Sequence, residues 1–199
     1  MIILGRHGNT FEAGTKAVWV GARSDLRLTS EGRMQAARVA AHLRHSDLVP
    51  RKVVAGPLLR TRDFAQIVAS DFGLRVEIDD DLRELDYGEW EGLDSAAVAN
   101  RFGTETLTAW EESLAWPGNS SGWGESPDIV RKRVGAALER LSALERPVFA
   151  CTSNGILRFV WVLTRGLVNM RASKVRTGAI CLLNAGANGF DVKEWDHPP

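Results

Sequence analysis

The alternation of apolar and polar residues along the chain predicts a repeated unit of strand and helix. Residues 1–4 and, after Lys52, residues 53–55 are short apolar runs, and the pattern predicts strands at 1–4 and 52–55. Each run is followed by a segment in which apolar residues recur at helical spacing, at 28–45 and again at 56–72. This spacing gathers the apolar side chains on one face of a helix, so the pattern predicts strand, helix, strand and helix in succession.

After an irregular segment, the second half of the chain returns to the same pattern. The predicted elements are a weak strand at 76–78, a helix at 129–144, a strand at 147–150, a helix at 156–163 and closing strands at 179–183 and 190–195. Strands that alternate with helices form largely parallel sheets that are covered on both faces. We therefore expect an α/β fold.

Residues 90–125 interrupt this rhythm with glycines, serines, acidic residues and several tryptophans. Two short helices are predicted there, and the segment is interpreted as an inserted helical cap. No linker, internal repeat or low-complexity tract divides the chain, so a single domain over 1–199 is expected. The tryptophans of the segment are Trp90, Trp110, Trp116 and Trp123.

Composition narrows the classes of function. The 199 residues carry 25 basic and 25 acidic side chains, and a net charge of zero gives no general attraction to nucleic acid or to an anionic membrane. No stretch approaches the ~18 apolar residues of a spanning helix, and the N-terminal apolar run is too short for a signal peptide. A cytoplasmic protein is expected, in which Cys151 and Cys181 stay reduced inside buried strands.

Three arginines follow predicted strands. The segments GRHGNT, AGPLLR and CTSNGILR come after the first, second and fourth strands and contain Arg6, Arg60 and Arg158. The carboxyl ends of parallel strands share one edge of a sheet, where ligands bind and where helix N-termini attract anions. Because the guanidinium fork matches phosphate oxygens, three such groups at this edge predict a phosphate pocket.

The segment CTSNGILR by itself admits three interpretations: a cysteine phosphatase loop, a helix cap, or half of a site that is completed elsewhere. The first interpretation fails on spacing, because that loop has five residues between cysteine and arginine, whereas six separate Cys151 from Arg158.

His7 directly follows the first predicted strand, between Arg6 and Gly8. An imidazole with a pKa of ~6.5 is largely neutral at pH 7 and attacks phosphorus without a separate base. A backbone carbonyl that holds one ring nitrogen would leave the other free, and Gly8 permits the tight turn that this needs. Taken alone, a histidine at this place is explained more simply as part of a surface loop.

Five short motifs follow one another along the chain: RHGNT, LTSEGRMQA, GPLLRTRDFA, LRELDYGEWEG and GESPDIVRKRV. Together they span nearly the whole sequence, and their order resembles the histidine phosphatase superfamily, the phosphoglycerate-mutase-like proteins. The resemblance implies a three-layer α/β/α sandwich with a mostly parallel central sheet. It also implies a reaction without metal or cofactor, in which a histidine takes the phosphoryl group and water then releases it.

The resemblance assigns roles to residues of this chain. His7 falls on the histidine that becomes phosphohistidine, and Arg6 and Arg60 fall on the arginines that bind phosphate. Glu84 falls on the acid that protonates the leaving oxygen. Physical chemistry alone does not choose among the acids of LRELDYGEWEG, because general acid catalysis depends on reach and on a raised pKa. These acids are Glu84, Asp86, Glu89 and Glu91.

The main departure from the family pattern is Asn154, which stands where a second histidine normally contacts the phosphoryl group. Its amide donates a neutral hydrogen bond and carries no charge, so slower catalysis is expected. Asn154 also suits the N-cap of a helix that begins at Gly155, and both roles are compatible. Asn154, Gly155 and Asn9, which replaces the usual Glu or Gln, are predicted to bind the substrate phosphate. Ala13 and Gly56 stand where asparagine and serine are common.

The preferred function is hydrolysis of a small phosphate monoester with a neutral or partly apolar leaving group. A mutase must hold a second anion, but residues 89–128 contain eight acids and one base. Residues 155–188 contain five bases and no acid, and some of these bases could reach the pocket, although a basic run is more often a solvated face. Trp110, Trp116 and Trp123 are candidate contacts for the leaving group, or core residues.

The alternatives are mutase-type phosphotransfer and a catalytically impaired protein that binds a phosphate ligand. The expected partner is a small phosphate ester, with no nucleic acid, membrane, metal or cofactor, and a homodimer is left open. His42 and His45 lie three residues apart, but no third metal ligand accompanies them.

Overall fold

The computed structural model of the chain describes residues 1–118, 121–186 and 189–199, which contain six strands, six α-helices and three short 3-10 helices. None of these helices is long and apolar enough to cross a membrane. The strands are β1 (Ile2–Arg6), β2 (Lys52–Ala55), β3 (Val76–Ile78), β4 (Val148–Thr152), β5 (Ile180–Gly186) and β6 (Gly189–His197). The α-helices are α1 (Ser30–Arg44), α2 (Leu59–Asp71), α3 (Ser95–Phe102), α4 (Thr104–Ser113), α5 (Pro127–Ala143) and α6 (Asn154–Arg165). The 3-10 helices are η1 (Asp80–Leu82), η2 (Gly88–Trp90) and η4 (Met170–Ser173).

All six strands belong to one sheet in the order β3-β2-β4-β1-β5-β6. Strands β1 to β4 pair in parallel, whereas β5 is antiparallel to both β1 and β6. The parallel strands need crossover connections, which the helices supply, while β5 and β6 are antiparallel neighbours in the sheet. The fold is therefore an α/β sandwich with a mixed sheet, in agreement with the prediction of a mostly parallel sheet.

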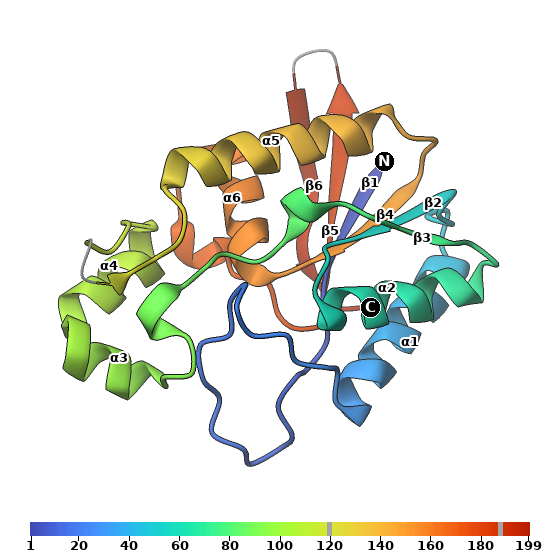
Figure 1. Cartoon of the computed structure of the whole chain (residues 1–199). Helices are drawn as coiled ribbons and strands as arrows, with labels where there is room; N and C mark the ends of the chain where they lie inside the picture. Colours follow the sequence, from blue (N-terminus) through green and yellow to red (C-terminus); the bar gives the residue numbers. More distant parts are fainter. Residues whose placement is uncertain (119–120, 187–188) are drawn as a thin grey trace.

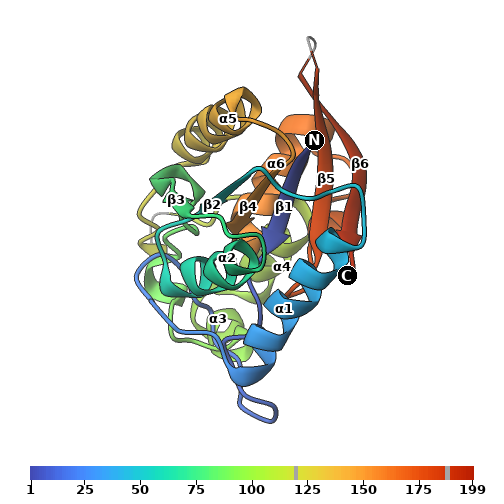
Figure 2. The same cartoon turned by 90° about the vertical axis from the view of Figure 1, so that its right-hand side faces the viewer.

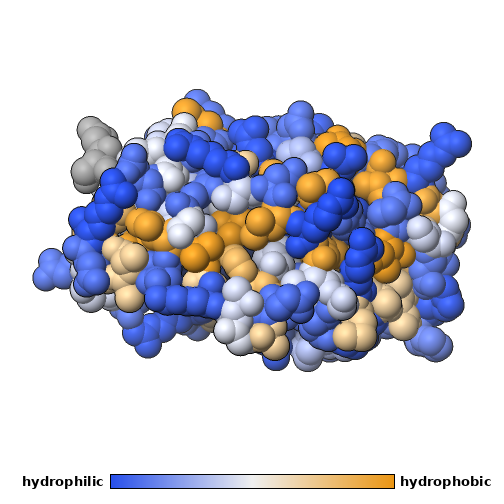
Figure 3. All heavy atoms as spheres, turned by 60° about the horizontal axis from the view of Figure 1, so that its bottom comes forward, coloured by the Kyte–Doolittle hydropathy of each residue, from blue (hydrophilic) through white to orange (hydrophobic). Residues whose placement is uncertain are grey.

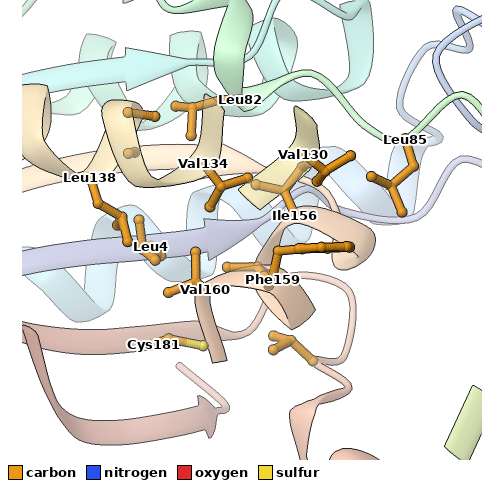
Figure 4. Close-up of a cluster of buried hydrophobic side chains, with 14 of the residues drawn as sticks. Leu4, Leu82, Leu85, Val130, Val134, Leu138, Ile156, Phe159, Val160 and Cys181 are labelled. Atoms are coloured by element: carbon orange, nitrogen blue, oxygen red, sulfur yellow. The ribbon is translucent and has the colours of Figure 1, made fainter. Parts of the chain in front are cut away.

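Helices cover both faces of the sheet (Figures 1 and 2). Ile3 of β1 packs with buried residues of α1 and α2, whereas its neighbours Ile2 and Leu4 pack with those of α5 and α6. Successive side chains of a strand point to opposite faces, so the unbroken apolar run at the start of the chain contributes to two cores. Figure 4 shows the second core, in which Leu4 lies near Val134 of α5 and Val160 of α6.

The cap helices α3 and α4 and the segment 7–29 lie at the carboxyl ends of the parallel strands (Figure 1). Aromatic rings pack α4 against the residues around it. Trp110 is buried and makes edge-to-face contacts with Tyr87, Trp116 and Trp123 at centroid separations of 6.1, 5.8 and 4.7 Å. Such pairs add specific geometry to the burial of apolar area, so this cluster fixes the cap against the loop that follows η1.

Candidate active site

A pocket of about 580 Å3 opens at this edge of the sheet. Its inner part lies where β1, α2, the loop after η1 and the start of α6 converge, and residues 10–20 form its outer part. Figure 3 looks onto this side of the molecule and shows a band of apolar residues between hydrophilic ones. Six of the seven predicted site residues line the pocket, and Gly155 does not. The inner lining consists of Arg6, His7, Asn9, Arg60, Glu84, Tyr87, Asn154 and Thr177.

The imidazole of His7 is buried and held in one orientation. Its Nδ1 donates to the carbonyl of Gly8 at 2.8 Å, so Nε2 carries the free lone pair. The backbone N–H of His7 donates to the carbonyl of Thr152 at 3.0 Å, which fixes the end of β1 against β4. Burial, and then the charges of Arg60 and Arg6, lower the pKa of His7 well below its ordinary 6.5. The ring is therefore neutral at pH 7, with Nε2 available to a ligand.

Two guanidinium groups line the pocket without a carboxylate partner. Arg60 is only 1% exposed and donates to the carbonyls of Ser24 at 2.7 Å and Gly21 at 3.1 Å. Arg6 donates to the carbonyl of Val175, and its buried Nε has no hydrogen-bond partner. Within the described part of the chain neither arginine forms an ion pair. Buried charges are normally paired, so this arrangement favours the binding of an anion, and the planar fork suits phosphate oxygens.

Glu84 is the buried carboxylate of the pocket. Its Oε1 accepts from the N–H of Leu85 at 2.9 Å, and its Oε2 accepts from the N–H of Gly155 at 3.2 Å. Burial outweighs these bonds and the nearby guanidinium charges, and it raises the pKa of Glu84 above its ordinary 4.5. A carboxyl group that holds its proton to higher pH suits general acid catalysis.

The other three acids of the same motif do not line the pocket. Each of them accepts hydrogen bonds or forms an ion pair elsewhere, so the geometry separates Glu84 from its neighbours where the sequence alone did not. The partners are Arg23 for Asp86, Arg101 for Glu89 and Ser24 for Glu91.

Gly155, which was predicted to contact the substrate phosphate, does not line the pocket. Its N–H is engaged by Glu84, and it lies behind that side chain instead of in the pocket lining. A Cβ at this position would lie 2.7 Å from the Tyr87 hydroxyl and closer still to Oε1 of Glu84. Glycine is therefore required by the close approach of the carboxylate.

Asn154 is the first residue of α6. The N-cap position, which the sequence pattern assigned to Asn154, is occupied by Ser153. The Asn154 side chain accepts from the N–H of Val175 at 2.9 Å through Oδ1. Because the oxygen is engaged there, the amide nitrogen is the end that remains for a ligand in the pocket. Asn154 therefore offers a neutral donor to the site.

Asn9 is held in a similar way. Its Oδ1 accepts from Thr177 Oγ1 at 2.5 Å and from Gln35 Nε2 at 3.3 Å, while its backbone N–H donates to Gln35 Oε1 at 2.7 Å. These bonds leave the amide nitrogen of Asn9 as a second neutral donor on the pocket lining.

Arg158 turns away from the pocket, so two of the three expected arginines converge. Its buried side chain donates to the carbonyls of Trp110 at 3.2 Å and Glu111 at 2.8 Å and to Ser173 Oγ at 3.1 Å. The guanidinium also lies 5.1 Å from the ring centroid of Trp110, so Arg158 ties α6 to the cap.

None of the bases in residues 155–188 lines this pocket, and those other than Arg158 also contact groups outside it. Their partners are Val192 for Arg165, Glu112 for Arg171, Glu111 for Lys174 and Asp196 for Arg176.

The cap tryptophans are core residues. Trp110 is buried, and Trp116 and Trp123 pack against the same hydrophobic core. The tryptophan that does line the pocket is Trp19, together with Tyr87. Tyr87 belongs to the motif LRELDYGEWEG and so carried a sequence signal, whereas Trp19 lies in an irregular segment without periodicity.

In the described ranges no three His, Cys, Asp or Glu side chains lie close enough together to hold a metal ion. Cys151 and Cys181 are free and buried. Burial raises the pKa of Cys151 well above its ordinary 9.0 and that of Cys181 to about 12, so neither thiol ionises readily.

Comparison with known proteins finds relatives over the whole chain. Residues 2–198 match the family model of the histidine phosphatase superfamily (branch 1). A 2,3-bisphosphoglycerate-dependent phosphoglycerate mutase of Azorhizobium caulinodans is 29% identical over 202 residues, which cover 98% of this chain and 97% of that protein. A glucosyl-3-phosphoglycerate phosphatase of Mycobacterium tuberculosis is 29% identical over 168 residues, 78% of this chain and 71% of that protein. The solved structure of a mycobacterial glucosyl-3-phosphoglycerate phosphatase in complex with VO3 has a TM-score of 0.84 at 25% identity and covers 98% of both chains.

Proposed function

The chain belongs to the histidine phosphatase superfamily, and from this premise we propose that it hydrolyses small phosphate monoesters through a phosphohistidine formed on His7. One observation carries the proposal. The neutral imidazole of His7, with its Nδ1 hydrogen-bonded to the Gly8 carbonyl, shares a buried pocket with two guanidinium groups that have no carboxylate partner. This combination supplies a nucleophile and a binding site for the anion that it attacks.

Four side chains are proposed to bind the phosphoryl group. Arg6 and Arg60 neutralise its charge, and the amide nitrogens of Asn9 and Asn154 donate to its remaining oxygens. In this arrangement the guanidinium groups supply the charge stabilisation that a metal ion provides in other phosphatases, so the reaction is proposed to be independent of metal.

The chemistry then needs His7 and Glu84. Nε2 of His7 attacks phosphorus, the bond from phosphorus to the leaving oxygen breaks, and Glu84 transfers its proton to that oxygen. Glu84, now ionised, takes a proton from a water molecule that attacks the phosphohistidine. The bond from phosphorus to Nε2 breaks, which releases inorganic phosphate and returns His7 to its neutral form.

Hydrolysis is preferred to mutase chemistry because of the charges in the pocket. A phosphoglycerate substrate carries a carboxylate besides its phosphate, and each anion needs a cation. Among the described lining residues the cationic side chains are Arg6 and Arg60, both placed in the inner part. The bases of residues 155–188 are engaged with the cap, with Asp196 or with β6, so they do not supply a second anion site.

Turnover of simple phosphate esters in excess chelator tests this proposal. His7→Ala should lower kcat by about a thousandfold or more, because removal of a nucleophile abolishes the covalent route. His45→Ala, which removes an exposed histidine directly after α1 and outside the pocket, is the matched control and should turn over like the wild type.

Two other outcomes would redirect the assignment. Isomerisation of phosphoglycerate in the presence of a bisphosphoglycerate, faster than release of phosphate, would establish a mutase. Absence of turnover in the wild type, together with turnover in Asn154→His, would indicate a binding protein that kept the phosphate pocket and lost catalysis.

A further inference from the structure

The outer part of the pocket is built mostly from one irregular segment, residues 10–20, here called the strap. Most of the strap residues that line the pocket are apolar, in contrast to the charged inner part. If the phosphate binds among the charged inner residues, as proposed above, the strap is the surface that the rest of the substrate meets. Its apolar lining residues are Phe11, Ala13, Ala17, Val18, Trp19 and Val20.

Trp19 is the rigid member of the strap. Its backbone N–H donates to the carbonyl of Leu93 at 2.8 Å, and its carbonyl accepts from the N–H of Gly92 at 2.9 Å. Its indole packs edge-to-face on Tyr87 and on Trp90, with centroid separations of 5.2 and 5.1 Å. The ring is only partly buried by these contacts, and it also lines the pocket. A fixed aromatic ring at the mouth of a pocket is a surface on which an apolar or aromatic group stacks without first being ordered.

The charge of the strap is unfavourable to anions. Glu12 is the ionisable strap residue on the pocket lining, and it is negative and exposed. The strap's basic residue, Lys16, is not on the lining and pairs with Asp94 at the start of α3. A carboxylate or second phosphate on the leaving group would therefore meet Glu12 and no free cation on the described strap.

We propose that Trp19 and Glu12 determine the leaving-group specificity of the enzyme. The preferred substrates are phosphate monoesters whose alcohol part is uncharged and has a flat apolar or aromatic portion that stacks on Trp19. Esters with a second anionic group are disfavoured by Glu12. The inference rests on the proposed hydrolase function, since it concerns the part of the substrate that leaves.

The test compares kcat/KM for phenyl phosphate, glycerol phosphate and phosphoglycerate in one buffer. Trp19→Leu keeps an apolar side chain and removes the aromatic ring, and Trp116→Leu makes the same change in a cap residue outside the pocket. We expect Trp19→Leu to lower the ratio of kcat/KM for phenyl phosphate over glycerol phosphate about three- to tenfold, and Trp116→Leu to leave that ratio unchanged.

Glu12→Gln tests the electrostatic part. We expect it to raise the ratio of kcat/KM for phosphoglycerate over glycerol phosphate about two- to threefold at low ionic strength, with the gain lost in high salt because Glu12 is exposed. Unchanged ratios in both Trp19→Leu and Glu12→Gln, with turnover that still depends on His7, would overturn the specificity proposal alone. Absence of His7-dependent turnover on all three esters would overturn the hydrolase proposal instead.

Discussion

Replacement of Glu84 by glutamine separates the proton-donating function of this residue from its structural one. Glutamine has nearly the same size, so the side chain still fills its buried position. Its amide nitrogen cannot accept a hydrogen bond, so one of the two bonds from Leu85 and Gly155 is lost. A single such bond contributes about 1 kcal/mol, so we expect a fall in Tm of about 2–4 °C and a folded protein.

The effect on catalysis depends on the leaving group. General acid catalysis contributes about 10²–10⁴-fold when the leaving oxygen needs a proton, as in an alkyl ester such as glycerol phosphate. An aryl oxyanion leaves readily without a proton, so kcat for an activated aryl phosphate should fall by less than about tenfold. The measurement is single-turnover release of each alcohol by wild type and Glu84→Gln.

The pH dependence follows from the direction of two pKa shifts. The pKa of His7 lies well below 6.5, so its nucleophilic form is present through neutral pH and is lost only in more acidic solution. The pKa of Glu84 lies above 4.5, so its protonated form persists to higher pH than in an ordinary glutamate. This form is lost as the pH rises through the raised pKa. We expect alkyl ester hydrolysis to decline on the alkaline side, and this decline should be absent in Glu84→Gln.

Equal losses for alkyl and aryl esters would show that Glu84 does not donate a proton to the leaving oxygen. An unchanged alkaline decline in Glu84→Gln would show that the decline belongs to another group.

Three further predictions concern the same pocket. Asn154→His should raise kcat about tenfold, because a protonated imidazole donates a charge-assisted hydrogen bond to the phosphoryl group where the amide donates a neutral one, although the N–H of Val175 then loses its acceptor; an unchanged or lower kcat in a folded variant would contradict this. Gly155→Ala should lower kcat about a hundredfold by displacing Glu84. As a control, Gly135→Ala in α5, where a Cβ meets nothing within 4 Å, should stabilise the protein by roughly 0.5–1 kcal/mol in denaturant titration. Equal activities in the two variants would count against the placement of Glu84. Inorganic phosphate at about 100 times its Kd should raise Tm by roughly 5–10 °C, and retention of this shift in Arg60→Gln would show that phosphate binds elsewhere.

The sequence predicts the layers of the fold well because the signals involved are local. Ile2, Ile3 and Leu4 form a run that is typical of a strand buried on both faces. The apolar spacing in α1 and α2 likewise marks the faces that pack on the sheet. The candidate site follows in part from the same logic, since His7 and Arg60 come directly after strands or at helix starts on one edge.

The sequence misplaces Arg158 and does not indicate Trp19, because a long side chain and an irregular backbone segment determine where these two residues lie. Arg158 lies four residues after Asn154, near the same helix terminus, yet its length lets it reach the carbonyls of Trp110 and Glu111 in the cap. No sequence period indicates that direction. Trp19 lies in a segment whose backbone pairs with the loop after η2, and such pairings between irregular segments leave no repeating pattern in the sequence.

Rapid quenching shows whether His7 carries the phosphoryl group during turnover. The protein is mixed with phosphate ester in excess chelator, quenched in alkaline detergent at successive times, and digested for mapping of phosphorylated peptides by mass spectrometry. We expect phosphate on Nε2 of His7, formed no more slowly than the first turnover and lost when the ester is exhausted. Full turnover with His7 unmodified throughout, or with the phosphoryl group on another residue, would contradict it.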